Sequence, residues 1–243
     1  MNKWIINRQV KAAGFTLLEI LIAILIFAIV ITTLFSSFNA FIISSKEVKE
    51  NVRQTDQIIN VYKRISQDLE AIFVLQVPRY KKPGFDSEPD PFSFVGKEET
   101  IDQEVVASLV FSSLAHAKFG DDQMSGVAKI AYYVRQNENR SLDLCRADLL
   151  PPFPEEIKSC NDPILLKNIS GFEVVYKDKS GDEFKYWNSE AQEFNYTFPS
   201  SIDFKIIFGP GFETDSETSS TTVNQQQITL MSFDIIATRP PIE

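Results

Sequence analysis

The chain has 243 residues, of which 44% are hydrophobic and 23% are charged, and its formal net charge is -9. This length and apolar content suit one domain or two small ones, and they exclude a disordered chain and a multi-pass membrane protein. Two cysteines, one histidine and an acidic balance exclude a disulfide scaffold, a multi-histidine metal site and a nucleic-acid partner, because binding to phosphate needs clustered lysine and arginine.

The N-terminal segment is basic and is followed by a long apolar run. No charged residue occurs from Ile20 to Ser45, and a helix of that length would reach roughly 39 Å, more than the ~30 Å hydrocarbon thickness of a bilayer. The basic flank predicts a cytoplasmic N-terminus, with the rest of the chain outside the cytoplasm. A conventional signal peptide is disfavoured because the small residues Ala12-Ala13-Gly14 precede the apolar run instead of following it.

Glu19 is the unusual residue of this segment, because it places a carboxylate near the start of an apolar helix. An unpaired acid costs about 2.5–3.5 kcal/mol at the centre of a membrane helix and less near its end, so Glu19 requires a partner. The alternative is a plain signal anchor in which Glu19 lies at the level of the lipid headgroups.

The segment from Gly14 to Ile20, with the sequence GFTLLEI, resembles the type IV prepilin family. This resemblance implies that a prepilin peptidase removes residues 1–14 by cutting between Gly14 and Phe15, and that the new amine of Phe15 is methylated. It also implies that the Glu19 carboxylate pairs with the N-terminal ammonium of a neighbouring subunit in a filament.

Residues 15–45 are therefore expected to form a transmembrane and assembly helix, and residues 46–77 an amphipathic continuation that Pro78 ends. Apolar side chains in the continuation recur at gaps of three and four, which predicts one face packed on the following domain. These residues are Ile58, Tyr62, Ile65, Leu69 and Ile72. A coiled coil is the alternative, but fewer than three clear heptads are present.

Residues 78–243 predict a β-rich domain that begins with a loop over 78–102. Apolar runs and alternation then predict several strands, joined in part by hairpin turns. The expected strands cover residues 105–114, 128–134, 141–146, 172–177, 184–187, 202–208 and 227–238. A mobile loop is expected over 213–226, which is rich in serine, threonine and glutamine. The predicted class is α+β, with one long N-terminal helix packed on antiparallel sheet, as in pilins.

The strand pattern of this domain looks like that of the J-type minor pseudopilins of type II secretion systems (general secretion pathway protein J). The segments that carry this second resemblance lie at residues 108–116, 130–134 and 174–187. The presence of Glu19 counts against the K type. The resemblance implies a structural subunit at the tip of the periplasmic pseudopilus, single-pass in the inner membrane with a periplasmic C-terminal domain. Its expected partners are the I-type and K-type minor pseudopilins, the major pseudopilin and prepilin peptidase.

Two other functions remain open from the sequence. One is a minor pilin of a type IV pilus, and the other is a membrane-anchored periplasmic enzyme or sensor with a chance prepilin-like leader. No enzyme is expected, because His116 lies in no recognisable catalytic motif and a loop or strand-end position explains it. No cofactor is expected. Calcium is a minor alternative at Asp121-Asp122 or residues 178–183, which lack the EF-hand pattern.

Cys145 and Cys160 form an even pair in the part assigned to the oxidising side of the membrane. A disulfide between them would close a loop of about 15 residues and stabilise the fold by roughly 3 kcal/mol in the chain-entropy model. The alternative is two unrelated thiols, because the sequence does not give the Cα separation that decides the bond.

Overall fold

The structure is a computed structural model that describes residues 16–77, 79–84, 90–117, 126–138, 140–154, 157–209 and 228–236. It divides into two compact units, of which the first ends at Glu50 and the second begins at Asn51. Helix α1, Leu17–Glu70, starts in the first unit and ends in the second. The expected loop over 213–226 lies outside the described residues.

Helix α1 ends at Glu70, so the predicted continuation to residue 77 was too long by seven residues. The backbone leaves the helix there because it pairs with a strand of the sheet. Phe73 N donates to Ser112 O at 2.8 Å, and Leu114 N donates to Ala71 O at 2.9 Å. These bonds satisfy backbone groups that one more helical turn would have used. Pairing with the sheet therefore ends the helix, and Pro78 does not.

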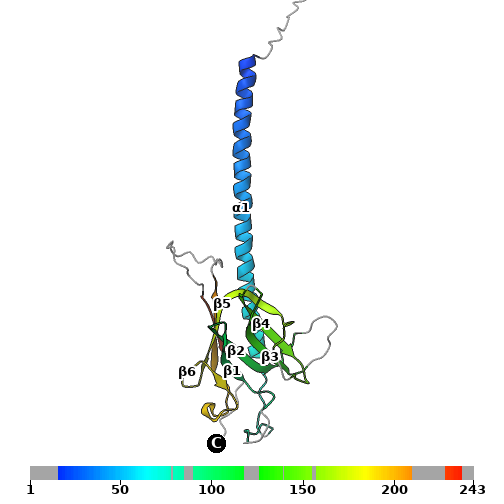
Figure 1. Cartoon of the computed structure of the whole chain (residues 1–243), viewed down its shortest axis with the longest axis vertical. Coiled ribbons are helices and arrows are strands. Elements are labelled where there is room, and N and C mark those ends of the chain that lie inside the picture. Colours follow the sequence, from blue (N-terminus) through cyan, green and yellow to red (C-terminus); the bar gives the residue numbers. More distant parts are fainter. Residues whose placement is uncertain are drawn as a thin grey trace, which may run out of the picture. The chain divides into compact units, whose positions relative to one another are not determined.

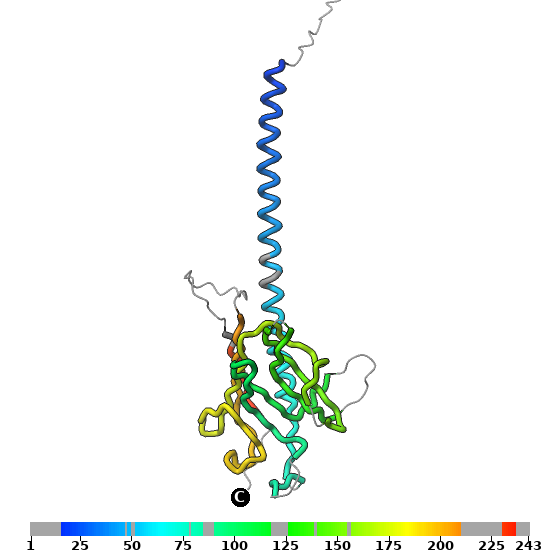
Figure 2. The backbone as a smooth tube through the Cα atoms, in the orientation of Figure 1, coloured from blue at the N-terminus to red at the C-terminus, as the bar shows by residue number. Residues whose placement is uncertain are grey.

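The described residues of the second unit form nine strands in one antiparallel sheet. This sheet beside the long helix α1 confirms the predicted fold class (Figure 1). The strands are β1 Val95–Ile101, β2 Glu104–Ser113, β3 Ala128–Gln136, β4 Leu142–Leu149, β5 Ile164–Lys177, β6 Glu183–Phe184, β7 Trp187–Asn188, β8 Ser201–Phe208 and β9 Ile228–Asp234. Their order is β7-β1-β2-β3-β4-β5-β8-β9, with β6 paired to β5. Figure 2 shows the orange and red strands β8 and β9 side by side, as their register requires.

Three strand predictions differ from the structure. Strand β1 lies inside the stretch predicted as a loop, because its lysine and two glutamates hide the alternation expected of a strand. Strand β5 begins at Ile164, eight residues before the predicted start. The predicted strand 184–187 is two short strands that pair with different neighbours, since β6 pairs with β5 and β7 with β1.

The core lies between one face of the sheet and the last turns of α1. Val61, Ile65 and Leu69 are buried at gaps of four, and they pack with inward side chains of the strands. Strand β8 shows the matching pattern, in which every second residue is buried, so that Phe204 and Ile206 reach the core. Burial of about 25 cal/mol per Å² of apolar surface is the main term holding this end of the helix to the sheet.

Candidate assembly site

The N-terminal end of α1 is built by Thr16 and Glu19. Glu19 N donates to Thr16 Oγ1 at 3.3 Å and to Thr16 O at 3.1 Å, so Thr16 caps the first turn. The spacing Thr-x-x-Glu is that of a capping box, a local signal that could have located the helix start within a residue. Glu19 also lies where the partial positive charge of the helix dipole favours a carboxylate. Gly14 and Phe15 lie outside the described residues.

The Glu19 side chain is exposed, and no described residue gives its carboxylate a partner. A shallow groove runs from Glu19 along one side of the helix past Ile20, Ala23, Ile24 and Phe27. Ala23 lies one turn after Glu19, and its small side chain leaves the space beside the carboxylate open. This geometry presents an anion at the end of an apolar surface.

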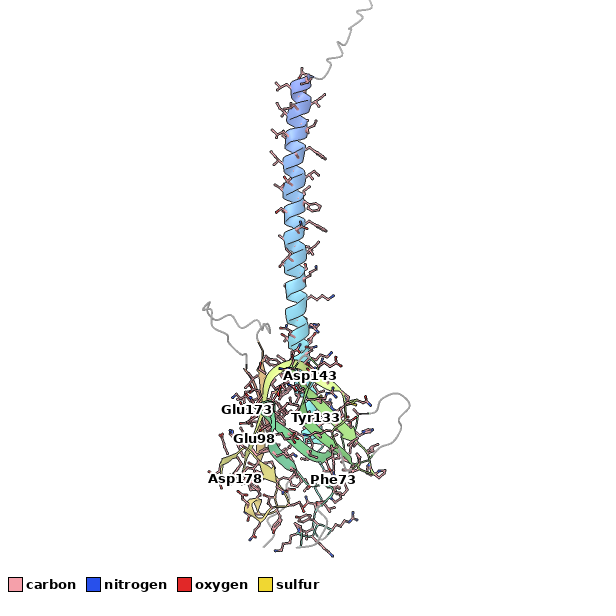
Figure 3. The ribbon with its side chains drawn as sticks, in the orientation of Figure 1. Phe73, Glu98, Tyr133, Asp143, Glu173 and Asp178 are labelled. Carbon is pink, nitrogen blue, oxygen red and sulfur yellow. The ribbon has the colours of Figure 1, made fainter. Side chains whose placement is uncertain are left out.

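The segment Leu17–Lys46 is long and apolar enough to cross a membrane, and none of its most apolar window is buried (Figure 3). Small side chains occupy every fourth position along one face of this segment. They are Ala28, Thr32, Ser36, Ala40 and Ser44. Bulky side chains occupy the opposite face at gaps of four and three. They are Phe27, Ile31, Leu34, Phe38 and Phe41.

These two faces suit close packing between helices in lipid. Small residues at a four-residue spacing let two helix backbones approach, and the bulky face supplies complementary volume. The hydroxyl of Thr32 donates to Ala28 O at 2.9 Å, and that of Thr33 donates to Val30 O at 2.9 Å. Both hydroxyls are satisfied within the helix, so they can face hydrocarbon or another helix without a further partner.

In the second unit, a buried ion cluster joins the last turns of α1 to the sheet. The Asp68 carboxylate receives Arg146 Nε at 2.7 Å, Arg146 Nη2 at 3.0 Å and Arg64 Nη2 at 2.6 Å. The Tyr132 hydroxyl donates to the same carboxylate at 2.5 Å. Asp68 and Arg146 are 0% and 3% exposed, so these charges compensate each other where water does not reach.

The pKa values of the cluster follow from this arrangement. Burial raises the pKa of Tyr132 well above its ordinary value, and the adjacent Asp68 charge raises it further. Burial alone would lower the pKa of Arg146, but hydrogen bonds and attraction from Asp68 outweigh burial and hold it above its ordinary value. Tyr132 is therefore a neutral donor and Arg146 a permanent cation at neutral pH.

The one histidine of the chain sits beside this cluster. His116 Nδ1 lies 2.6 Å from Asp148 Oδ1, while Asp148 Oδ2 receives Arg146 Nη1 at 2.7 Å and Ala117 N at 2.8 Å. Burial raises the pKa of Asp148, but these donors outweigh it and hold the pKa below the usual value. A histidine with an aspartate is two-thirds of a hydrolytic triad. Here Arg146 also holds the aspartate. The hydroxyl of Ser113, at the end of strand β2, donates to the backbone carbonyl of Asp68 at 2.8 Å.

The expected calcium positions are only partly described. Asp121 and Asp122 lie outside the described residues. In the turn after β5, Asp178 Oδ1 accepts from Ser180 N at 2.7 Å and Asp182 N at 3.0 Å, which is ordinary turn chemistry. No group of three or more potential metal ligands occurs among the described residues.

Cys145 and Cys160 are free thiols in the structure, and the possible disulfide between them stays a prediction. Cys145 is buried on β4, whereas Cys160 is exposed in the connection to β5. The two thiols differ in accessibility because Cys145 packs with Ala131, Tyr133 and Ala147. The sequence could not give this difference.

Comparison with known proteins identifies a motif at the N-terminal end of the chain. A family model described as the prokaryotic N-terminal methylation motif matches residues 10–35. No curated protein sequence matches the chain significantly. Among solved structures, the chain is similar to a type IV-like pilin from Thermus thermophilus, at 12% identity and a TM-score of 0.37, over 75% of this chain and 92% of that one.

The matched segment contains Gly14, Phe15 and Glu19. The chain therefore carries the N-terminal motif of prepilin-like proteins, followed by one apolar helix and an antiparallel sheet.

Proposed function

We propose that this protein is a J-type minor pseudopilin of a type II secretion system. It is a structural subunit at the tip of the periplasmic pseudopilus, where it helps to initiate assembly and drive protein export across the outer membrane. The observation that supports this most strongly is a methylation motif leading directly into the apolar segment Leu17–Lys46, whose most apolar window is not buried. Such a surface requires lipid or other helices around it.

The proposed processing removes residues 1–14 on the cytoplasmic face of the inner membrane. Prepilin peptidase cuts between Gly14 and Phe15 and methylates the amine of Phe15. Lys3, Arg8 and Lys11 leave with the leader, and while present they hold the N-terminus in the cytoplasm. Residues 15–45 then cross the membrane, and the domain after them lies in the periplasm.

In the assembled state, the Glu19 carboxylate pairs with the N-terminal ammonium of an adjacent subunit. The exposed carboxylate beside Ala23 supports this role, since it has no described partner within its own chain. An ion pair in apolar surroundings offsets part of the desolvation of both charges. Glu19 thus has two roles, one in starting its own helix and one in positioning its neighbour.

The helix and the sheet domain supply the remaining contacts with partners. The small face from Ala28 to Ser44 would pack against the bulky face of the next helix, which makes a head-to-tail contact that does not close. We propose I-type and K-type minor pseudopilins and the major pseudopilin as these neighbours. This subunit performs no chemical step, and it holds no cofactor.

A minor pilin of a type IV pilus is the second candidate, because the same motif at residues 10–35 suits it. Deletion of the gene in its host separates the two. Loss of exported proteins from the medium with intact pili supports the pseudopilin, and loss of pili with intact export supports the pilin. If neither changes, both assignments fail.

The Glu19→Ala variant tests the assembly role. Cleavage after Gly14 should continue, while cross-linking to partner subunits in membranes should fall at least about tenfold, the effect of roughly 1.4 kcal/mol. Thr16→Val is the matched control, because it removes the cap and leaves the carboxylate. If the two variants assemble equally poorly, Glu19 acts through the helix start and the intersubunit pair is wrong.

A further inference from the structure

The connection from β4 to β5 is described at residues 150–154 and 157–163, which lie over the face of the sheet opposite α1, and we call these residues the strap. Ala131 and Tyr133 point to this face because the residues between and beside them on β3 belong to the main core. Ile157 of the strap packs on the cluster that these side chains form with Cys145. The Lys129 ammonium lies 4.5 Å from the ring centroid of Phe153.

Polar contacts fix the second half of the strap above β3. Tyr133 of β3 is labelled in Figure 3. Its hydroxyl lies 2.8 Å from Ser159 O and 2.7 Å from Asp162 Oδ2. Arg135 Nη1 donates to Cys160 O at 2.6 Å. The Lys158 ammonium pairs with Glu99 on β1. Cys160 is thereby held beside β3, the strand on which Tyr133 pairs with Cys145 of β4.

The register brings the two cysteines into one neighbourhood. Cys145 is the Cα partner of Tyr133 on one side and of Ile164 on the other. Cys160 stands four residues before Ile164, in a turn closed by Asp162 N donating to Ser159 O at 3.3 Å. Arg146 N donates to Pro163 O at 3.0 Å, which ties the chain three residues after Cys160 to the residue that follows Cys145 on β4.

We propose that Cys160 and Cys145 are a redox pair in which exposed Cys160 reacts first with a disulfide oxidant and buried Cys145 then closes the bond. The resulting disulfide fastens the strap to β4. The location of the pair on the oxidising side of the membrane rests on the proposed function. The order of reaction rests on exposure alone, which is 0% for Cys145.

The chemistry balances with a disulfide of a low-molecular-weight thiol or of an oxidoreductase as oxidant. The Cys160 thiolate attacks one oxidant sulfur, a mixed disulfide forms, and the other oxidant sulfur leaves as a thiolate. The Cys145 thiolate then attacks the Cys160 sulfur, which breaks the mixed disulfide and releases the second oxidant thiolate. Two electrons pass to the oxidant, and its thiolates take up the two protons that the cysteines lose. Burial raises the pKa of Cys145, which disfavours its thiolate and agrees with Cys160 reacting first.

The test uses the full chain, purified reduced in detergent micelles and exposed to oxidised glutathione. Thiols that survive are alkylated, and intact masses are measured. The wild type should lose both alkylatable thiols and retain no glutathione. Cys145→Ala should hold one glutathione trapped on Cys160, and Cys160→Ala should remain unmodified.

Two results would overturn the pair. One is a wild type that keeps both thiols or keeps glutathione on Cys160, and the other is a Cys160→Ala variant that reacts as fast as Cys145→Ala. Because the assay needs no membrane orientation, its failure leaves the proposed function intact. A bond that forms in micelles but is absent from cells would instead count against the periplasmic location.

Discussion

The apolar segment Leu17–Lys46 exposes its large side chains, with Leu17 82% and Phe41 70% exposed, whereas the sheet domain buries ionised ones such as Asp68. In the segment, the apolar surface is not covered by the rest of the chain, and Glu19, the one acid of the segment, has no described countercharge. In the domain, the buried Asp68 already holds its countercharges, Arg64 and Arg146. Under the proposed function, the segment therefore needs an assembly to cover its surface, while the domain forms its core within one chain.

The largest expected effect comes from Asp68→Ala in the domain. It leaves Arg146 buried without its main countercharge, which should lower the free energy of unfolding by about 3–5 kcal/mol. Urea unfolding of the full chain in detergent measures this. The surface pair of Glu173 and Lys205 is the matched control, and Glu173→Ala should change stability by about 0–1 kcal/mol. Equal losses for the two variants would show that the buried cluster is no more important than a surface pair.

Gly96→Ala should have the next largest effect on the stability of the domain. A Cβ added at Gly96 would lie 1.9 Å from Tyr176 Oη, where β1 passes over the buried ring. Overpacking of this kind lowers stability by about 1–3 kcal/mol. Gly126→Ala is the control, because its nearest contact is Leu150 at 3.9 Å and it should unfold like the wild type. Thermal unfolding curves that coincide for the two variants would contradict the packing of β1.

Ala40→Leu perturbs the segment instead of the domain. It fills the small face of the helix and should weaken association with neighbouring helices by about 1–2 kcal/mol, the scale of single interhelical contacts in membranes. The unfolding of the sheet domain should not change. Ala40→Ser keeps the small size and should assemble normally. Cross-linking yields in membranes measure this association. If Ala40→Leu cross-links as well as the wild type, the small face does not contact neighbouring helices.

The pH dependence of the domain gives the smallest effect. Asp148 has a pKa held below its ordinary value, so its ionised form stabilises the fold above the unfolded pKa of about 3.9. This contribution is lost as pH falls through the still lower folded pKa. Asp148→Asn should therefore flatten the acid side of the stability profile measured by urea unfolding between neutral and acidic pH. An unchanged acid limb would mean that other carboxylates control it.

The sequence predicts the segment better than the domain. The charge-free run after Glu19 and the basic residues before it are local features, and the methylation motif at residues 10–35 agrees with them. The end of α1 was missed because the pairing of Phe73 with Ser112 on β2 is non-local. Strand β1 was missed because β7 pairs with it only at Val95 and Gly96, and the unpaired side of the rest carries lysine and glutamate that look like loop composition.

The buried cluster could not be predicted either. Asp68, Tyr132 and Arg146 lie far apart in the sequence, and in isolation each looks like an ordinary polar or aromatic residue of a helix or strand. Tyr132 lies on the core face of β3, and no pattern in the sequence indicated that its hydroxyl would meet a carboxylate from α1. The cap at Thr16 is different, since its Thr-x-x-Glu spacing was present in the sequence.

The identity of the mature N-terminus tests the central claim most directly. The protein is isolated from membranes of its host, and its N-terminal peptide is analysed by mass spectrometry. The account predicts that the chain begins at Phe15 with a methylated amine and that residues 1–14 are absent. A chain that still carries residues 1–14 would contradict it, and α1 would then be an ordinary membrane anchor.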